Sequence, residues 1–295
     1  MDDKTEAFLR LRPRLFGIAY RMLGSRAEAE DTVQDTYLKW HQAEAGDLRS
    51  SEAFLVTLAT RTSIDRLRRL KTQRADYFGP WLPEPLAEAD YGSPQWRMEL
   101  ADDVSIAFLA ILEKLSPEER AVFLLREVFE FEYAEIAAIV AKSEAACRKM
   151  HSRARDRVQS DRPRFAVSEE AHRRMLETFA RAAKAADREE LARLLAHEAT
   201  LSADGGGKAP AVFRVLRGSD RILRFFVAIA GLLARRGTTL TYRPAPINGQ
   251  PGMLRFLDGK LHSAMTIDTD GERIFGVYIV ANPDKLERFG SFRQH

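Results

Sequence analysis

The chain has 295 residues, of which 45% are hydrophobic and 30% charged, and its formal net charge is +3. These values are typical of a globular protein with two or three domains, and they exclude a disordered or fibrous chain. The longest apolar stretches, such as 225–234, are too short to span a bilayer, and the start MDDKTEAFLR lacks the apolar core of a signal peptide. The single cysteine, Cys147, excludes an internal disulfide and a cysteine-based zinc site, so we expect a cytoplasmic protein without membrane anchor, metal or cofactor.

Positive charge is concentrated in two segments. Lysines and arginines crowd between Arg61 and Arg74 and again between Arg148 and Arg157, where the only acidic residues are Asp65 and Asp156. Such clusters on helices are typical of phosphate-binding surfaces, and equally of ordinary solvated helix faces. Charge alone leaves both interpretations open.

The first part of the chain predicts helices. Residues 5–75 are nearly free of glycine and proline, and Ser25 with Glu28 three positions later resembles a capping box. After a polar break, a second helix is expected over about 53–70.

A segment rich in proline and glycine, about 75–94, interrupts the helical pattern and predicts an extended linker. The helical pattern resumes from about 95 to 160. Within it, Ser116 followed by Pro117 and two glutamates is a strong helix start.

The stretch EYAEIAAIVAKSEAACRKMHSRARDRV predicts a helix-turn-helix. Its first helix carries an apolar stripe, a short turn follows, and Ser143 is placed to cap the second helix. In that second helix we expect four side chains to face the core: Ala146, Met150, Ala154 and Val158. The remaining faces carry the residues we predict to contact DNA, namely Arg148, Lys149, Ser152, Arg153 and Arg155.

From about 167 the pattern changes to that of an α+β domain. Helices are expected over 171–186, 188–197 and 220–234, followed by strand-like sequence with hairpin turns at Asp258-Gly259 and Asp270-Gly271. The glycine run 205–207 ahead of Lys208 is not a phosphate-binding P-loop, because Ala-Pro follows the lysine where Ser or Thr is required. We interpret it as a tight bend at the edge of the domain, with Asp204 and Lys208 as polar contacts for the linker.

Three segments together resemble the bacterial extracytoplasmic-function (ECF) sigma factors. They are LFGIAYRMLGSRAEAEDTVQDTYLKWH, FLVTLATRTSIDRLRRLKTQR and LEKLSPEERAVFLLREVFEFEYAEIAAIV with CRKMHSRAR, and the likeness covers roughly residues 5–160. The resemblance implies two all-α domains, region 2 and a helix-turn-helix region 4. We expect region 2 at 5–75, a linker at 76–97, region 4 at 98–162 and an α+β domain at 168–290. The implied partners are core RNA polymerase, through its β′ clamp helices and β subunit, and promoter DNA, whose −35 element the second helix of the helix-turn-helix is implied to bind.

The same resemblance implies roles for residues of region 2. Residues implied to dock on polymerase are Asp31, Gln34, Asp35 and Leu38. From the sequence alone, Asp31 and Asp35 could equally be a solvated acidic face or, less commonly, a metal pair. Residues implied to capture the unwound −10 strand are Asp47, Leu48, Arg49, Ser50, Arg61, Thr62, Asp65, Arg66 and Arg69. Many family members carry Asn where this chain has Arg61, so promoter specificity does not transfer.

The C-terminal part resembles SnoaL-like domains of the cone-shaped NTF2-like fold, and an ECF subgroup with this extension shares the segments WLPEPL, DGGGK and NPDKL. We expect WLPEPL to dock near the other two, against the alternative of an exposed linker, so that the tail regulates the sigma domains. The expected contact residues are Trp81, Leu82, Pro83, Asp204, Gly205, Gly206, Gly207, Lys208, Asn282, Pro283, Asp284, Lys285 and Leu286. NPDKL also has the pattern of a capped short helix, which is compatible with a contact role.

The sequence therefore predicts a sigma factor that is not an enzyme and is a monomer when free, with room for an unidentified small ligand in its C-terminal domain. Two rivals remain. One is a ligand-responsive DNA-binding transcription factor that acts without polymerase. The other is a SnoaL-like isomerase or cyclase, whose acid/base candidates would be Asp204, His262 and Asp268.

Overall fold

The computed structural model describes residues 3–43, 51–87, 96, 104–161 and 167–291. The chain divides into two compact units, which we call the helical unit and the C-terminal unit. The helical unit comprises residues 1–76, 91–104 and 108–162, and the C-terminal unit comprises 77–90, 105–107 and 163–295. Most of the predicted linker therefore belongs to the C-terminal unit. Within the described ranges, no helix is long and apolar enough to cross a membrane.

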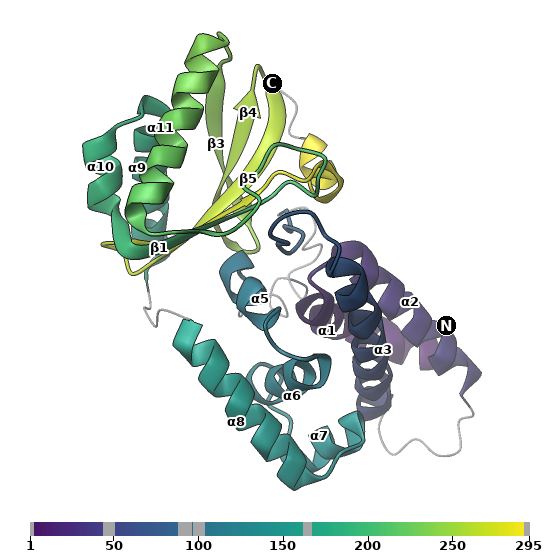
Figure 1. Ribbon diagram of the computed structural model, residues 1–295. Helices are drawn as coiled ribbons and strands as arrows, with labels where there is room; N and C mark the ends of the chain where they lie inside the picture. The colour runs from purple at the N-terminus through teal and green to yellow at the C-terminus, as the bar shows by residue number, and fades with distance from the viewer. Residues whose placement is uncertain (1–2, 44–50, 88–95, 97–103, 162–166, 292–295) are drawn as a thin grey trace. The chain divides into compact units, whose positions relative to one another are not determined.

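The helical unit contains only helices in its described residues (Figure 1). They are α1 Asp3–Leu23, α2 Arg26–Gln42, α3 Ser51–Arg74, α5 Ile106–Leu112, α6 Pro117–Glu127, α7 Tyr133–Val140 and α8 Glu144–Asp161, of which only the first two residues of α5 fall in the C-terminal unit. Helix α1 packs against α2 and α3, while α6 packs against α7 and α8. The prediction of all-α sigma-type domains is confirmed.

Hydroxyl caps begin three of these helices where the sequence predicts them. The Ser25 hydroxyl accepts from the Glu28 backbone N–H at 3.5 Å. Ser116 and Glu119 form a complete capping box, with Pro117 in the first turn. Ser143 accepts from the backbone N–H of the third helical residue at 3.2 Å. Each cap satisfies an amide that the helix itself leaves without an acceptor.

The C-terminal unit is a curved sheet covered by helices on one face (Figure 1). Its elements are α9 Glu169–Ala185, α10 Arg188–Leu194, β1 Leu195–Asp204, β2 Leu216–Arg217, α11 Ser219–Arg235, β3 Leu240–Ile247, β4 Gln250–Leu257, β5 Lys260–Thr269, β6 Ile274–Val280, η3 Pro283–Lys285 and η4 Glu287–Ser291. In the described residues the sheet has six strands in the order β2-β1-β6-β5-β4-β3. Only β1 and β6 run parallel; the other neighbouring strands are antiparallel. The α+β prediction is confirmed.

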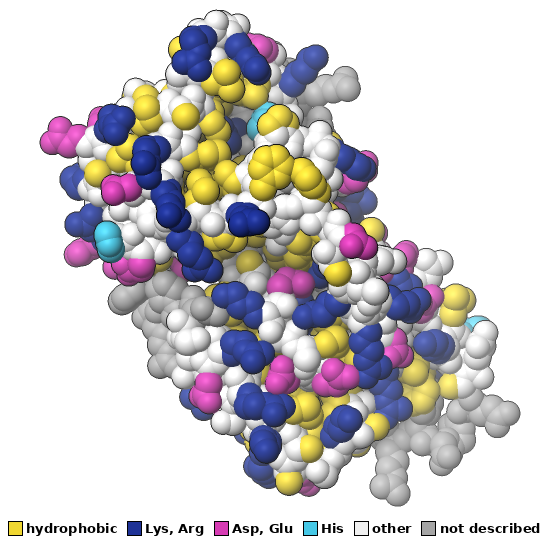
Figure 2. Space-filling model, viewed as in Figure 1, with side chains coloured by type: hydrophobic (Ala, Val, Ile, Leu, Met, Phe, Trp, Pro, Cys, Tyr) yellow, Lys and Arg dark blue, Asp and Glu magenta, His cyan; other side chains and the backbone are white. Residues whose placement is uncertain are grey.

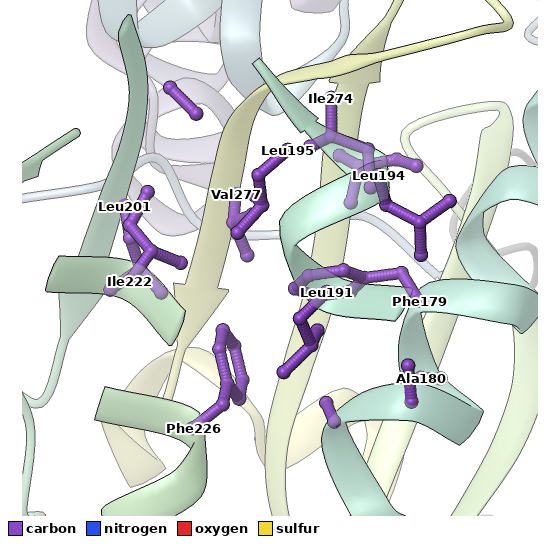
Figure 3. Packing of buried hydrophobic residues seen from close by; sticks show 14 of the residues in the cluster. Phe179, Ala180, Leu191, Leu194, Leu195, Leu201, Ile222, Phe226, Ile274 and Val277 are labelled. Carbon is purple, nitrogen blue, oxygen red and sulfur yellow. The ribbon is translucent and has the colours of Figure 1, made fainter. Parts of the chain in front are cut away.

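An apolar core fills the space between the sheet and its helices (Figure 3). Phe179 of α9 and Phe226 of α11 meet edge to face, with ring centroids 5.1 Å apart. Leu191 of α10 and Val277 of β6 complete the contact between the two layers. All four side chains are buried, so this core holds the three helices against the sheet.

The predicted helix 188–197 is too long. Helix α10 ends at Leu194, and Leu195 begins β1, where it lies opposite Ile274 of β6. Pairing with a strand almost eighty residues away overrides the local helix preference, which is a weak influence on structure. The hairpin turn at Asp258 and Gly259 is as predicted, with φ of 48° and 76°.

Candidate nucleic-acid interface and docked linker

The second helix of the helix-turn-helix, α8, packs through a stripe that agrees with the prediction at Ala154 and Val158 and differs by one position in the first half of the helix. Cys147, His151, Ala154 and Val158 are buried, whereas Ala146 and Met150 are only half-buried. The predicted fourfold spacing drifts around a helix by about 40° at each step, because 3.6 residues complete a turn. The observed steps of four, three and four residues follow one face.

His151 connects the three helices of this motif. Its Nδ1 lies 2.9 Å from the hydroxyl of Tyr133 on α7, and its Nε2 lies 2.8 Å from a carboxylate oxygen of Glu127 at the end of α6. These contacts set the position of α8 relative to the first helix of the motif.

The predicted −35 residues are all exposed: Arg148, Lys149, Ser152, Arg153 and Arg155. Arg148 stacks over the Tyr133 ring at 4.3 Å and pairs with Glu144 at 3.3 Å. An exposed ion pair of this kind contributes little to stability, so a DNA phosphate can readily replace the Glu144 carboxylate as the partner of Arg148. Figure 2 shows Lys and Arg side chains spread over this end of the helical unit.

The predicted polymerase-docking residues lie on α2. Asp31, Gln34 and Leu38 are exposed, and Leu38 is 51% exposed although it is apolar. Asp35 is half-buried and pairs with Arg66 of α3 at 2.7 Å. Within the described ranges, no cluster of three or more His, Cys, Asp or Glu is arranged to hold a metal ion.

Arg66, a predicted −10 contact, is held by α2. Its guanidinium also lies 2.8 Å from Glu28 and 3.5 Å from Asp31. Burial lowers the pKa of Arg66, but hydrogen bonds to Asp35 and Glu28 outweigh this and raise it above its ordinary value. Arg66 therefore joins α2 to α3 in this structure.

The other predicted −10 residues have varied surroundings. Asp47, Leu48, Arg49 and Ser50 lie outside the described residues. Thr62 is buried, whereas Arg61, Asp65 and Arg69 are exposed. Arg61 donates to the backbone oxygens of Ile139 and Ala138 at 2.8 and 2.9 Å, at the C-terminal end of α7. A cation there complements the negative end of the helix dipole.

A buried ionic cluster that the sequence analysis missed joins α3 to the start of α6. Glu113 accepts from Arg74 at 2.9 Å and from Arg120, which is fully buried. Arg74 also donates to the backbone oxygen of Leu23 at 2.7 Å, and Arg120 to that of Arg21 at 2.9 Å. Burial raises the pKa of Glu113, but the charges of Arg120 and Arg74 outweigh it and hold the pKa below its ordinary value. No local pattern could have revealed a triad drawn from three separate segments.

In the C-terminal unit, the linker is bound through the buried carboxylate of Asp204. Its oxygens accept from the Tyr77 hydroxyl at 2.6 Å, the Leu82 backbone N–H at 2.8 Å and the Lys285 ammonium at 2.7 Å. Lys285 also donates to the backbone oxygen of Leu82 and lies 4.3 Å from the centre of the Trp81 ring. The structure thus brings the WLPEPL, DGGGK and NPDKL segments together.

The linker is anchored by its leucines more than by its tryptophan. Leu82 and Leu86 are 2% and 0% exposed, whereas Trp81 is only half-buried; Pro83 is buried. Beyond them, the Leu86 N–H donates to the Asn248 side chain at 2.8 Å in the β3–β4 turn. Residues 77–86 of the linker form no helix or strand, and Ala87 makes an isolated antiparallel bridge to Ile247.

The glycine run allows close approach. Gly206 and Gly207 have φ of 58° and 71°, and a Cβ on Gly206 would lie 2.3 Å from the side-chain nitrogen of Asn282. That nitrogen donates to the Tyr77 hydroxyl at 3.0 Å, and the Asn282 oxygen caps η3, accepting from Asp284 N–H at 3.1 Å. Among the described residues, Lys208 pairs with Asp284 and has no polar contact with the linker, unlike the prediction.

The structure does not bring the acid/base candidates together. Asp204 is occupied by the linker. His262 and Asp268 both lie on β5, six residues and therefore about 20 Å apart along the strand. Tyr77 was missed by the sequence analysis, although its place just before FGPWLPEPL was the one available signal.

Comparisons with known proteins place these elements in a family. Residues 7–73 match the model of Sigma-70 region 2, and residues 105–158 match that of Sigma-70, region 4. The ECF RNA polymerase sigma factor SigJ of Mycobacterium tuberculosis is 34% identical over 291 residues, which cover 95% of this chain and 92% of SigJ. The chain belongs to the ECF sigma factors. In this sigma factor, the region 2 match contains α2 and all of α3 but its last residue, and the region 4 match contains α7 and most of α8.

The C-terminal unit of this sigma factor also has relatives. The probable ECF sigma factor SigI of M. tuberculosis is 27% identical over 97% of this chain and 96% of its own length. The crystal structure of M. tuberculosis SigJ superposes with a TM-score of 0.76 at 30% identity, covering 96% of this chain and 98% of that one. The sigma factor thus shares its C-terminal α+β domain, as well as its helices, with SigJ.

Proposed function

We propose that this ECF sigma factor binds core RNA polymerase and directs it to specific promoters, where it initiates transcription. Docking on the β′ clamp helices, with further contact to the β subunit, uses the exposed face of α2. Leu38 supports this role, since it is 51% exposed beside the exposed Asp31 and Gln34, so all three side chains are available for a contact with another protein.

Recognition of −35 DNA is assigned to α8. The observation that carries this assignment is the separation of its faces: one stripe that ends in Val158 is buried, while Arg148, Lys149 and Arg153 are all exposed. Arginine reads guanine edges in the major groove, and lysine binds phosphates.

Capture of the −10 strand requires a rearrangement. Arg61 is engaged by the end of α7, and Arg66 by the acidic face of α2. To contact DNA, both guanidinium groups must first release these protein partners. If they do not, Arg69 is the remaining predicted arginine that can contact the −10 strand. The contacts support a resting form of the helical unit that opens when polymerase and promoter bind.

The C-terminal domain acts as a regulator and not as an enzyme, and the protein works in the cytoplasm as a monomer until it meets polymerase. The binding of the linker through Asp204 and Lys285 supports this role, because residues 77–90 lie between the region 2 and region 4 segments of the chain. While this segment is docked, only the rest of the connecting chain is free to span the distance between region 2 and region 4. Its release would lengthen the free connection between these two regions.

Run-off transcription with purified core polymerase and the full chain tests the proposal. Specific transcripts are expected with the wild type, and fewer with Arg148→Ala, whereas Arg174→Ala on the exposed face of α9 serves as the control. DNA binding without any polymerase-dependent transcript would favour the rival transcription factor. Full transcription by Arg148→Ala, with unchanged affinity for −35 DNA, would contradict the assignment of α8.

A further inference from the structure

A cation lies buried in the sheet of the C-terminal unit. Arg255 of β4 is 4% exposed, and its partners in register are Tyr242 on β3 and Ser263 on β5. Side chains that lie directly opposite each other in antiparallel strands share one face of the sheet. Tyr242 packs against the core cluster beneath the helices, so this polar row lies on the helix-covered face.

A β-bulge adds a histidine to the row. Arg255 pairs with Ser263, but the next residue, Phe256, pairs with Leu261, so His262 is the extra residue on β5. A bulge redirects the side chains around it. The Nδ1 of His262 lies 3.2 Å from the Ser263 hydroxyl, and burial together with the positive charge of Arg255 lowers its pKa. The lowered pKa favours the neutral imidazole, so Arg255 supplies the positive charge of this row.

Arg255 has no counter-charge among the described residues. Its Nη1 lies 3.4 Å from the Ser263 hydroxyl, its guanidinium is 5.9 Å from the Tyr242 ring, and its buried Nε has no hydrogen-bond partner. By contrast Arg120, which is equally inaccessible, is paired with Glu113. Burying a cation without a paired anion lowers the stability of the folded protein. A ligand that supplies the anion offsets this cost.

We propose that Tyr242, Arg255, His262 and Ser263 form a binding site for a small organic monocarboxylate. A carboxylate matches the fork of a guanidinium and supplies the acceptor that Nε lacks. The apolar remainder of the ligand lies against the core cluster on which Tyr242 packs. Tyr242 and His262 are only half-buried, so solvent reaches the row on their side. This site goes beyond the proposed function, because binding needs neither polymerase nor DNA.

The test uses the full chain with benzoate and its neutral analogue benzamide, which differ in charge but share the ring. Titration calorimetry is expected to show saturable binding of benzoate and binding of benzamide weaker by about tenfold or more. In ¹H–¹⁵N spectra, benzoate is expected to shift the Nε–H signal of Arg255, assigned by its loss in Arg255→Met.

Two variants make the test specific. Arg255→Met is expected to weaken benzoate binding by about tenfold or more without lowering the melting temperature, since it removes an unpaired buried charge. Arg243→Met is the matched control. Arg243 lies on the same hairpin, but its neighbour in the strand register is Leu254, and its guanidinium stacks over the Phe256 ring at 4.8 Å. Benzoate binding by this variant is expected to be unchanged.

Several results would overturn the proposal. They are the absence of saturable benzoate binding, equal binding of benzamide, or wild-type affinity in Arg255→Met. If Arg255→Met fails to fold, Tyr242→Phe replaces it, with an expected severalfold loss of benzoate affinity; undiminished affinity in a folded Tyr242→Phe protein would equally refute the site.

Discussion

The backbone N–H of Leu82 donates a 2.8 Å hydrogen bond to the carboxylate of Asp204, which lies 122 residues later in the chain. The same carboxylate, fully buried, also accepts from Tyr77 and Lys285. A single side chain thus holds the linker and the segment after β6 in one place. The stability of the docked linker should therefore depend on the negative charge of Asp204.

Asp204→Asn keeps the size of the side chain but removes the charge. We expect the free energy of unfolding of the C-terminal unit to fall by about 3 kcal/mol, because Lys285, whose side chain is 13% exposed, loses its anion. Denaturant unfolding measures the change. Asp284→Asn is the control: its pair with Lys208 is 56% exposed on both sides, and a comparable loss there would contradict a special role for Asp204.

Linker docking should weaken at alkaline pH. Burial and the hydrogen bond to Asp204 raise the pKa of Tyr77 above its ordinary value of 10.0. A raised pKa means that docking is fully stable below pH 10.0 and loses stability as the pH rises above it, where only the released phenol ionises. Fluorescence of Trp81, with Trp81→Phe as the blank, should report the release.

Tyr77→Phe provides the comparison for this alkaline transition. The variant should be less stable at neutral pH by about 1–3 kcal/mol, since it loses the hydrogen bond to Asp204, but it should lack the alkaline step. An unchanged step in the variant would assign it to another group.

The leucines of the linker should matter more for docking than its tryptophan. Leu86→Ala is expected to destabilise the docked linker by about 2–4 kcal/mol, because Leu86 is fully buried. Trp81→Ala should cost less, as its ring is half-buried. Hydrogen exchange at the Leu82 amide measures both, and the reverse order would be inconsistent with the structure.

Promoter output tests whether this docking regulates transcription. Leu86→Ala and the pair Trp81→Ala with Pro83→Ala should both change the yield of run-off transcripts. If docking is lost but transcription is unchanged, the linker has a structural role and the regulatory proposal fails.

The helical unit should loosen in acid. Glu113 has a lowered pKa because Arg120 and Arg74 surround it, so its contribution to stability is complete above its ordinary pKa of 4.5 and is lost as the pH falls below that value. Glu113→Gln should cost about 3–5 kcal/mol at neutral pH, because two arginines lose their anion. In thermal melts, the melting temperature of the variant should also fall less between neutral and acidic pH than that of the wild type.

Glu118→Gln is the control for this prediction. Glu118 pairs with Arg68, whose side chain is 54% exposed, so about 1 kcal/mol or less is expected. Equal losses in the two variants would show that burial of the Glu113 triad is not what stabilises the unit.

The sequence by itself determined the features that depend on neighbouring residues. Ser116 with Pro117 begins α6, Ser143 caps α8, and Asp258-Gly259 turns the β4–β5 hairpin. Each depends on hydrogen bonds or φ preferences within a few residues, so local chemistry is sufficient. The order of the sigma motifs was likewise readable along the chain.

Some local features were nevertheless missed. Asn248-Gly249, with φ of 53° and 72°, forms the β3–β4 turn by the same chemistry as Asp258-Gly259, and the sequence could have revealed it. Strand β1 is different, because Leu195 joins the sheet only through pairing with β6, which no local pattern contains.

Only the tertiary structure decided the partners of the charged side chains. Arg66 was expected at DNA and pairs with Asp35; Arg74 lay in a basic cluster and meets Glu113; Arg255 lay inside an apolar strand and meets no carboxylate in the described residues. Charge acts through space over several ångströms and is strengthened by burial, so its consequences depend on contacts between distant segments. The glycine run ahead of Lys208 is the clearest case: its purpose, to admit Asn282 and the linker, is visible only in the folded chain.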